Sequence, residues 1–310
     1  MSSSSSRRCG VVSGANRGIG YEICRQLANE GVVVVATARD EKRGMEAVEK
    51  LKQLCGGEDE DSIVFHQLDV ADEVSISCLV DFVKTKFGKL DILVNNAGIG
   101  GVIIEGDTSI LKEMIDGDFS RANSIKEEPE TELKSNGAII QTYELAKQCL
   151  NTNYYGTKRM VEAFLPLLQL SHSPRIVNVS STLGNLKLLP NERARKVLSN
   201  GESLSEERVD EVVKEFLKNC KEAEAKGWAR YAPAYKVSKA AVNAYTRVLA
   251  KKYPKFCINC VCPGYVKTDM TINSGMLTPM EGAESIVKLA LMPDDGPSGL
   301  FFSRTNIMAF

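Results

Sequence analysis

Short apolar runs recur along this chain, and the segments between them are long enough to hold helices. The runs are Val11–Val12, Val32–Ala36, Ile63–Phe65, Ile92–Val94, Ile176–Val179 and Ile258–Val261. Apolar, β-branched runs that alternate with helix-length segments are typical of parallel strands joined by crossover helices. We therefore predict an α/β fold with a doubly wound parallel sheet and helices on both of its faces.

The domain organisation follows from what interrupts this alternation. We find no internal repeat and no linker, so residues 1–310 are expected to form a single domain. Two segments, at about 101–137 and 182–234, break the rhythm of strands and helices. We interpret both as insertions over the carboxyl edge of the sheet, which is where doubly wound folds bind their ligands.

Charge and cysteine content exclude several classes of partner. The chain has 39 basic and 40 acidic side chains, so nothing attracts a nucleic acid or an anionic membrane electrostatically. The nine cysteines are scattered and odd in number, which favours free thiols and a cytoplasmic location. Cys257, Cys260 and Cys262 raise the possibility of a metal or redox site. They lie in an expected strand, however, so we interpret them as core residues and expect no metal.

A glycine-rich turn follows the first expected strand and precedes a helix. Its sequence is Ser13-Gly14-Ala15-Asn16-Arg17-Gly18-Ile19-Gly20. Glycines at these positions allow a tight turn and bring a helix N-terminus close to a pyrophosphate. The turn predicts a dinucleotide site, and with it a Rossmann-type sheet.

The end of the second expected strand favours NADP over NAD. An NAD enzyme usually has an acidic residue there for the ribose hydroxyls, whereas this chain has Ala38 and Arg39. Arg39 and Arg17 together suit a 2′-phosphate, so NADPH/NADP⁺ is the expected cofactor. The adjacent Asp40 weakens this preference for NADP. In the alternative interpretation, Arg17 and Arg39 are simply solvated surface residues.

Tyr235 and Lys239 are spaced as Tyr-x-x-x-Lys, which places them on one face of a helix. A free phenol has a pKa of about 10, and a nearby ammonium lowers that pKa by favouring the phenolate. Tyr235 is thus a candidate general acid and base. Ser181 follows the Ile176–Val179 run, at the sheet edge where its hydroxyl can bond a substrate oxygen.

Six motifs, in this order, resemble those of the short-chain dehydrogenase/reductase family. They are Ser13–Gly20, Leu68-Asp69-Val70, Asn95-Asn96-Ala97-Gly98, Ser180-Ser181, Tyr235-x-x-x-Lys239 and Pro263-Gly264. Three further segments are similar to the plant salutaridine reductase and neomenthol dehydrogenase group, itself similar to monomeric carbonyl reductases. These segments are Phe65–Val70, Asn153–Gly156 and Asp294–Gly299.

The resemblance implies a catalytic set of Asn153, Ser181, Tyr235 and Lys239. It favours Ser181 over Ser180, assigns a water-linked proton path to Asn153, and implies that Lys239 holds the nicotinamide ribose. Asn151 would otherwise be a rival to Asn153. Cofactor contacts are implied at Gly14, Asn16, Arg17, Gly18, Ile19, Gly20, Arg39, Asp69, Val70, Asn95, Ala97, Gly98, Tyr235, Lys239, Pro263, Gly264, Val266 and Thr268.

Together these expectations predict an NADPH-dependent carbonyl reductase or alcohol dehydrogenase. Its substrate is expected to be a bulky, lipophilic, terpenoid- or alkaloid-like ketone, because apolar residues lie within and beside both insertions. The resemblance also implies a role in plant specialised metabolism. Two alternatives stay open: reduction of an enone C=C bond, and a non-catalytic NADP-binding module that senses redox state.

The second insertion carries a prediction about assembly. Ser205 can cap a helix whose apolar residues form one stripe. These residues are Val209, Val212, Val213, Phe216, Leu217 and Cys220. Similarity to monomeric carbonyl reductases implies that this helix covers the face through which many family members pair, so we predict a monomer. Alternatively, the stripe packs beside the substrate pocket and leaves that face open.

Overall fold

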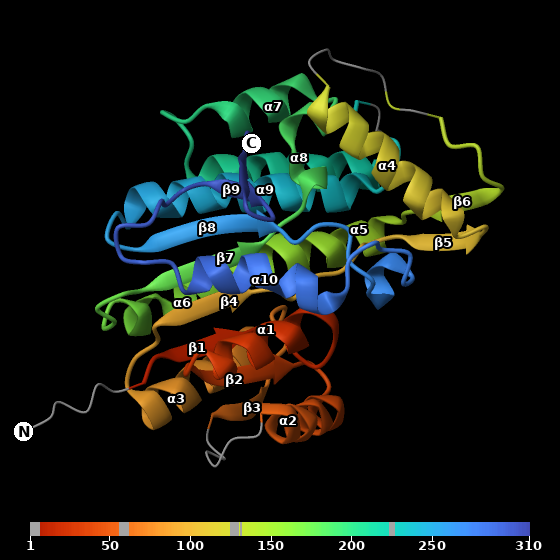
Figure 1. The fold of residues 1–310 in the computed structure, drawn as a ribbon. Helices are drawn as coiled ribbons and strands as arrows, with labels where there is room; N and C mark the ends of the chain where they lie inside the picture. Colours follow the sequence, from red (N-terminus) through yellow and green to blue (C-terminus); the bar gives the residue numbers. More distant parts are fainter. Residues whose placement is uncertain (1–6, 56–61, 125–129, 131, 223–226) are drawn as a thin grey trace, which may run out of the picture.

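The computed structural model describes residues 7–55, 62–124, 130, 132–222 and 227–310. A sheet of eight strands forms its centre, in the order β10-β9-β8-β7-β4-β1-β2-β3 (Figure 1). Neighbouring strands are parallel except for β9 and β10. The strands are β1 (Cys9–Val12), β2 (Val33–Ala38), β3 (Ile63–Gln67), β4 (Ile92–Asn95), β7 (Arg175–Val179), β8 (Cys257–Cys262), β9 (Phe301–Ser303) and β10 (Asn306–Met308). The predicted Rossmann-type doubly wound sheet is confirmed.

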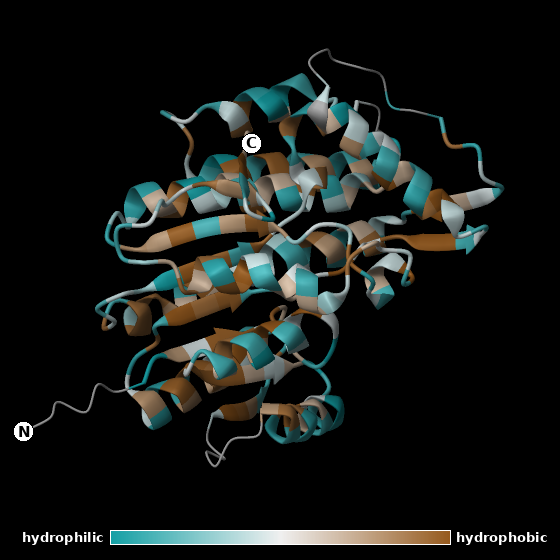
Figure 2. Ribbon diagram, viewed as in Figure 1, coloured by the Kyte–Doolittle hydropathy of each residue, from teal (hydrophilic) through white to brown (hydrophobic). Residues whose placement is uncertain are grey.

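Helices cover both faces of this sheet. The main ones are α1 (Gly18–Asn29), α2 (Glu41–Cys55), α3 (Glu73–Phe87), α5 (Tyr143–Leu150), α6 (Gly156–Leu168), α9 (Pro233–Lys252) and α10 (Pro279–Ala290). Val11 and Val35 point to a core shared with α3, α6 and α9, whereas Val12 and Val34 point to a second core shared with α1 and α10. Apolar residues accordingly fill the strands in Figure 2. The period of two along each strand produces the two cores.

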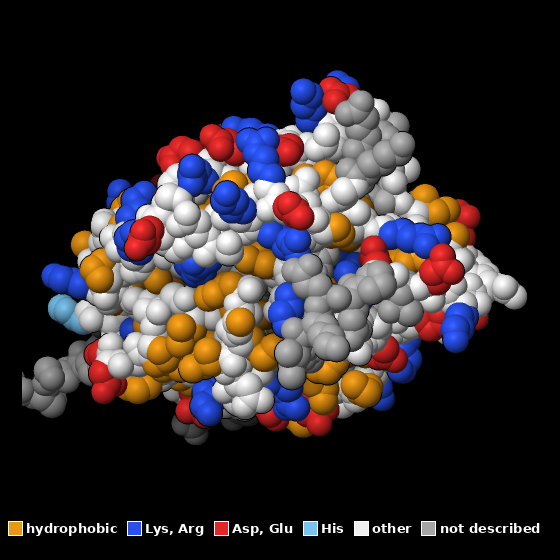
Figure 3. All heavy atoms as spheres, turned by 90° about the horizontal axis from the view of Figure 1, so that it is seen from above, with side chains coloured by type: hydrophobic (Ala, Val, Ile, Leu, Met, Phe, Trp, Pro, Cys, Tyr) orange, Lys and Arg blue, Asp and Glu red, His pale blue; other side chains and the backbone are white. Residues whose placement is uncertain are grey.

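All six expected strands are present, but four others were not anticipated. β9 and β10 extend one edge of the sheet, and a separate hairpin consists of β5 (Ile103–Gly106) and β6 (Gly137–Ile140). Cys257, Cys260 and Cys262 are buried along β8, as expected for core residues. None of the helices in the described ranges is long and apolar enough to cross a membrane. Basic and acidic side chains are intermixed on the face seen in Figure 3.

The first interruption forms β5, α4 (Ser109–Asn123) and β6. The second forms two short turns of helix, η2 (Thr182–Gly184) and η3 (Leu186–Leu188), followed by α7 (Glu192–Ser199) and α8 (Glu206–Lys221). Residues 125–129, 131 and 223–226 of these segments lie outside the described residues. The second segment, predicted to end at about 234, is followed by α9, which begins at Pro233.

The helix predicted after Ser205 is α8. The Ser205 hydroxyl accepts a hydrogen bond from the Arg208 amide, which confirms the cap. Val209, Val212, Val213 and Phe216 are buried, and α8 packs against α9 and α5. Since α9 also packs on β8, it lies between the sheet and α8 (Figure 1).

Candidate active site

The predicted motifs meet at the carboxyl edge of the sheet. Ser13 follows β1, Arg39 follows β2, Asn96 follows β4, Ser180 follows β7 and Pro263 follows β8. Nine of the predicted cofactor residues lie on the same edge, in the segments that follow β1, β3, β4 and β8. They are Asn16, Ile19, Asp69, Val70, Ala97, Gly98, Gly264, Val266 and Thr268. A cavity of about 750 Å³ opens beside them.

The glycine-rich turn is held against the segment after β4. Gly14 has a φ of 68°, and a Cβ added there would lie 3.1 Å from the Ala97 Cα. A Cβ on Gly20 would lie only 2.2 Å from the Gly14 carbonyl oxygen. The Asn96 side-chain amide donates to the carbonyl oxygens of Ser13 and Gly14, at 2.9 and 3.1 Å. Asn96 therefore shapes the turn, a role that no sequence pattern indicated.

The start of α1 fits a phosphate group. Its N-cap residue makes no side-chain capping hydrogen bond to the helix, and its first turn contains no acidic residue. The first backbone N–H groups of a helix have no partner within the helix and attract anions. Arg17, at this cap position, pairs with Asp269 of η4 (Asp269–Thr271). The residues present thus suit the pyrophosphate of a dinucleotide.

The residues around Arg39 bear on whether the adenosine ribose of the cofactor carries a 2′-phosphate. Asp40 accepts a hydrogen bond from the Arg43 amide at 2.9 Å, so its carboxylate binds a backbone amide in the first turn of α2. The Asp69 carboxylate accepts from the Ala71 amide at 2.9 Å. Arg39 is exposed beside this edge. Among the described residues at this edge, these two carboxylates are thus engaged by backbone amides.

Asn153 lies in η1 (Asn151–Tyr155), a single turn of π-helix between α5 and α6. Such turns occur often at functional sites. The Asn153 carboxamide accepts from the Ile99 amide at 2.8 Å and donates to the Ile99 carbonyl at 3.0 Å. It also donates to the Ser238 hydroxyl at 3.0 Å. Asn151 instead accepts from Arg159 at 2.8 Å, so of the two rivals Asn153 is the one that faces α9.

Tyr235, Lys239 and Ser181 are brought together by α9 and the end of β7. Tyr235 and Ser181 both line the cavity, and Ser180 is instead buried and donates to Asn243 at 2.6 Å. The Lys239 ammonium donates to the Val179 carbonyl at 2.8 Å and lies 5.6 Å from the centre of the Tyr235 ring. Gly98 allows the opposite wall to approach, since a Cβ there would lie 3.6 Å from Lys239 Nζ.

The pKa values of this pair differ from the expectation. Burial raises the pKa of Tyr235, and a hydrogen bond with Ser181 opposes that rise only in part. Burial lowers the pKa of Lys239 to about 8. The expected lowering of the Tyr235 pKa by the ammonium is absent because Lys239 is directed to Val179 rather than to the phenol oxygen. In the protein alone, Tyr235 is therefore a protonated phenol at neutral pH.

Among the other predicted cofactor residues, three have mainly structural contacts: Asn95, Val70 and Thr268. The buried Asn95 amide donates to Asn178 at 2.9 Å, which cross-links β4 and β7. Val70 packs on Gly156, where an added Cβ would lie 2.8 Å from the Val70 side chain. Thr268 caps η4, and its methyl group would lie 3.5 Å from a Cβ placed on Gly18. These contacts join the dinucleotide edge to the cavity.

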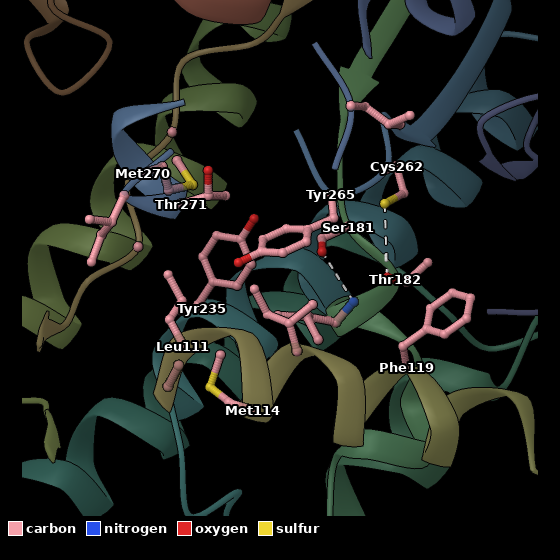
Figure 4. Close-up of a pocket in the computed structure, with 18 of the residues that line it drawn as sticks. Leu111, Met114, Phe119, Ser181, Thr182, Tyr235, Cys262, Tyr265, Met270 and Thr271 are labelled. Atoms are coloured by element: carbon pink, nitrogen blue, oxygen red, sulfur yellow. Dashed lines mark hydrogen bonds between the residues drawn. The ribbon is translucent and has the colours of Figure 1, made fainter. Parts of the chain in front are cut away.

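The cavity walls are mostly apolar (Figure 4). Leu111, Met114 and Phe119 come from α4, and Met270 comes from η4 on the other side. The apolar residues Val102, Ile104, Leu183, Tyr265 and Met276 also line it. The contribution of α4 was missed, although its apolar residues recur at helical spacing.

The fold and the site together define an oxidoreductase domain for a nicotinamide dinucleotide. Residues 8–191 match the family model of short chain dehydrogenase, and residues 221–295 match that of Enoyl-(Acyl carrier protein) reductase. The chain belongs to the short-chain dehydrogenase/reductase family. This confirms the resemblance inferred from the six motifs, and with it an oxidoreductase that acts on alcohol and carbonyl groups.

Close relatives extend along nearly the whole chain. The chain is 59% identical to a (+)-neomenthol dehydrogenase from Capsicum annuum, and the match covers 98% of each. It is 54% identical to a (-)-isopiperitenone reductase from Mentha piperita, again with 98% of each covered. A solved structure of salutaridine reductase from Papaver somniferum is similar with a TM-score of 0.82 and 51% identity, over 96% of this chain and 99% of that one. Carbonyl reductase [NADPH] 1 from Bos taurus is more distant, at 33% identity over 98% of this chain and 99% of that protein.

Proposed function

We propose that this enzyme uses NADPH to reduce a bulky, lipophilic, terpenoid- or alkaloid-like ketone to an alcohol, and catalyses the reverse reaction with NADP⁺. The apolar cavity that ends at Ser181 and Tyr235 is the observation that carries the proposal. An apolar wall with a few convergent polar groups is the usual form of a site for a lipophilic ligand. The relatives named for neomenthol, isopiperitenone and salutaridine support a substrate of this class and a place in plant specialised metabolism.

Each catalytic side chain has a distinct role in the proposed reaction. A bound nicotinamide supplies the hydride that adds to the carbonyl carbon. The Ser181 hydroxyl donates a hydrogen bond to the ketone oxygen, and the Tyr235 phenol transfers its proton to that oxygen. Lys239, whose ammonium donates to the Val179 carbonyl beside Tyr235, holds the nicotinamide ribose in this proposal. Asn153 fixes Ile99 and Ser238 around this group and supports the path by which the proton is replaced.

The proposed preference for NADPH rests on Arg39, because Arg17 pairs with Asp269. We expect Arg39→Ala to raise the KM for NADPH about 10- to 100-fold and to leave the KM for NADH nearly unchanged, because a charge-assisted hydrogen bond to phosphate is lost. Steady-state kinetics with both cofactors and one ketone measures this. Arg43→Ala, on the adjacent helix, is the control. Equal effects of Arg39→Ala on both cofactors would remove the phosphate contact from the proposal.

A panel of substrates tests the reaction itself. Purified protein is incubated with NADPH and with monocyclic and polycyclic ketones, enones and short hydroxy-ketones, and the products are identified. The proposal requires alcohols from the bulky ketones at a higher kcat/KM than from the short ones. Saturated ketones from the enones would instead indicate C=C reduction. Binding of NADPH without turnover would indicate the non-catalytic module.

We also propose that the protein is a cytoplasmic monomer. Its described cysteines are free thiols, in keeping with a reducing compartment. The outer side of α9 packs against α8, so a partner copy could not reach α9 there without displacing α8. Light scattering coupled to gel filtration should give a mass near 33.9 kDa. A stable dimer at low micromolar concentration would contradict the assignment.

A further inference from the structure

A buried group of charges joins the first insertion to the helix that carries Tyr235. Lys236 of α9 is fully buried, and its Nζ lies 2.8 Å from the Asp118 carboxylate on α4 and 2.9 Å from that of Glu130. Arg121 of α4 lies 3.2 Å from the other Asp118 oxygen. Because Asp118 is only 3% exposed, water screens these charges little.

The same face of α4 also forms the cavity wall. Leu111 and Met114, near the start of the helix, line the cavity. Asp118 and Arg121 follow on that face at helical spacing, where the helix is directed to the start of α9. The rest of α4 packs on η2, η3 and β6. The buried charges thus add a further contact to those that hold α4 over the site.

Glu130 fixes the segment that leads into α9. Its carboxylate accepts hydrogen bonds from the backbone amides of Arg230 and Tyr231, at 2.7 and 3.4 Å. The next residue, Ala232, has a φ of 46°, a conformation that costs free energy without such support. Tyr235 lies in the following turn, so this group of charges holds the cavity wall and the start of the catalytic helix together.

Lys236 favours the charged form of both carboxylates. Burial raises the pKa of Asp118, and the nearby Lys236 opposes that rise. Burial also acts to raise the pKa of Glu130, but Lys236 and the amides of Arg230 and Tyr231 outweigh it and lower that pKa. Removing one member of a buried ion group leaves an uncompensated buried charge, which is strongly destabilising when the protein cannot relax. Relaxation here would move α4.

We propose that Lys236, Asp118 and Glu130 form a latch that positions α4 against Tyr235 and thereby sets the preference for bulky over small ketones. The proposal rests on the ketone reductase function given above. Lys236 is a positioning residue in it and acts through α4. When α4 is loosened, a bulky ketone loses the wall that holds it near Tyr235, whereas a small ketone has little contact with that wall to lose.

The test compares Lys236→Met, Asp118→Asn and the double variant. Each single variant should lower kcat/KM for a menthone-sized ketone about tenfold or more, mainly through KM, because small displacements of a positioning wall are costly. The value for a short hydroxy-ketone should change much less. The double variant should be no worse than the more impaired single variant, because both changes open the same latch. An unchanged ratio between the two ketones in the folded variants would overturn the proposal.

Arg175→Met is the matched control. Arg175 is also buried and pairs with Asp294 at 2.7 Å, but it lies at the start of β7, at the opposite edge of the sheet from the site. This variant should lose stability and keep the ratio between the two ketones. A similar change of ratio in Arg175→Met would show that loss of stability alone explains the effect, and would overturn the proposal.

Hydrogen exchange separates the latch from the proposed function. Backbone amides of 109–122 should exchange faster in Asp118→Asn and Lys236→Met, while those of α10 keep the parent rate. If the parent enzyme reduces no ketone, the proposed function fails, yet this exchange still decides whether the latch holds α4. Unchanged exchange over 109–122 would overturn the latch. Asp118→Asn, which keeps the shape of the side chain, carries the test if Lys236→Met does not fold.

Discussion

Tyr235→Phe should lower kcat for ketone reduction by about 10²- to 10⁴-fold, the range that a positioned general acid usually contributes. The reason is that Phe keeps the ring in the cavity wall but removes the proton. Burial raises the pKa of Tyr235, so the phenol holds its proton at neutral pH and is in the correct state to donate to a ketone oxygen. Binding of NADPH should be nearly normal, because the phenol serves proton transfer.

Tyr265→Phe is the matched control for this experiment. Tyr265 lines the same cavity, but its hydroxyl is engaged by Ser274. Its removal should change kcat by less than about tenfold, in line with the loss of one ordinary hydrogen bond. Single-turnover reduction and NADPH titration on the two variants separate chemistry from binding. Near-normal single-turnover reduction by Tyr235→Phe would take the acid role away from Tyr235.

The parallel sheet could be predicted because its strands are buried on both faces and appear as continuous apolar runs. The same rule explains what was missed. β9 and β10 are three residues each and lie at the sheet edge, and β5 and β6 form a hairpin outside the main sheet. Short strands of this kind leave little periodic signal in a sequence.

The site residues divide in the same way, into those that a local sequence pattern indicates and those that it does not. Glycine turns and the Tyr-x-x-x-Lys spacing are local patterns, so the sequence, through the order of its motifs, could indicate their residues as candidates for the site. Lys236 and Glu130 are 106 positions apart, and no local pattern connects them. Nor does sequence reveal a π-helical turn at Asn153, since that turn depends on contacts with Ile99 and Ser238 from other elements.

Lys239 presents a conflict between activity and stability. It is almost completely buried, and burial lowers its pKa to about 8, below the ordinary 10.5 of the unfolded chain. Below pH 8 both states hold the proton, and the folded state bears the full cost of the buried charge, of the order of 3 kcal/mol. Between pH 8 and 10.5 the unfolded chain binds more protons than the folded one. The contribution of this group to the free energy of unfolding therefore rises with pH across that window.

Lys239→Met should consequently abolish most turnover while raising the melting temperature at pH 7. The variant removes the cost of the buried charge but also the hydrogen bond from the charged ammonium to Val179, worth about 1.5–3 kcal/mol, so we expect a net gain of up to about 1.5 kcal/mol. The gain should shrink as the pH rises from 8 to 10.5, because the parent then folds with a neutral Lys239. Thermal unfolding of the ligand-free parent and variant at pH 7 and pH 10 measures this gain.

Lys158→Met is the control. Pairing with Asp210 and Glu206 raises the pKa of Lys158 despite the opposing effect of burial, so this change should destabilise the protein. A Lys239→Met protein that melts below its parent at pH 7 would show that the ammonium is stabilising where it lies, and that its low pKa has been assigned to the wrong cause.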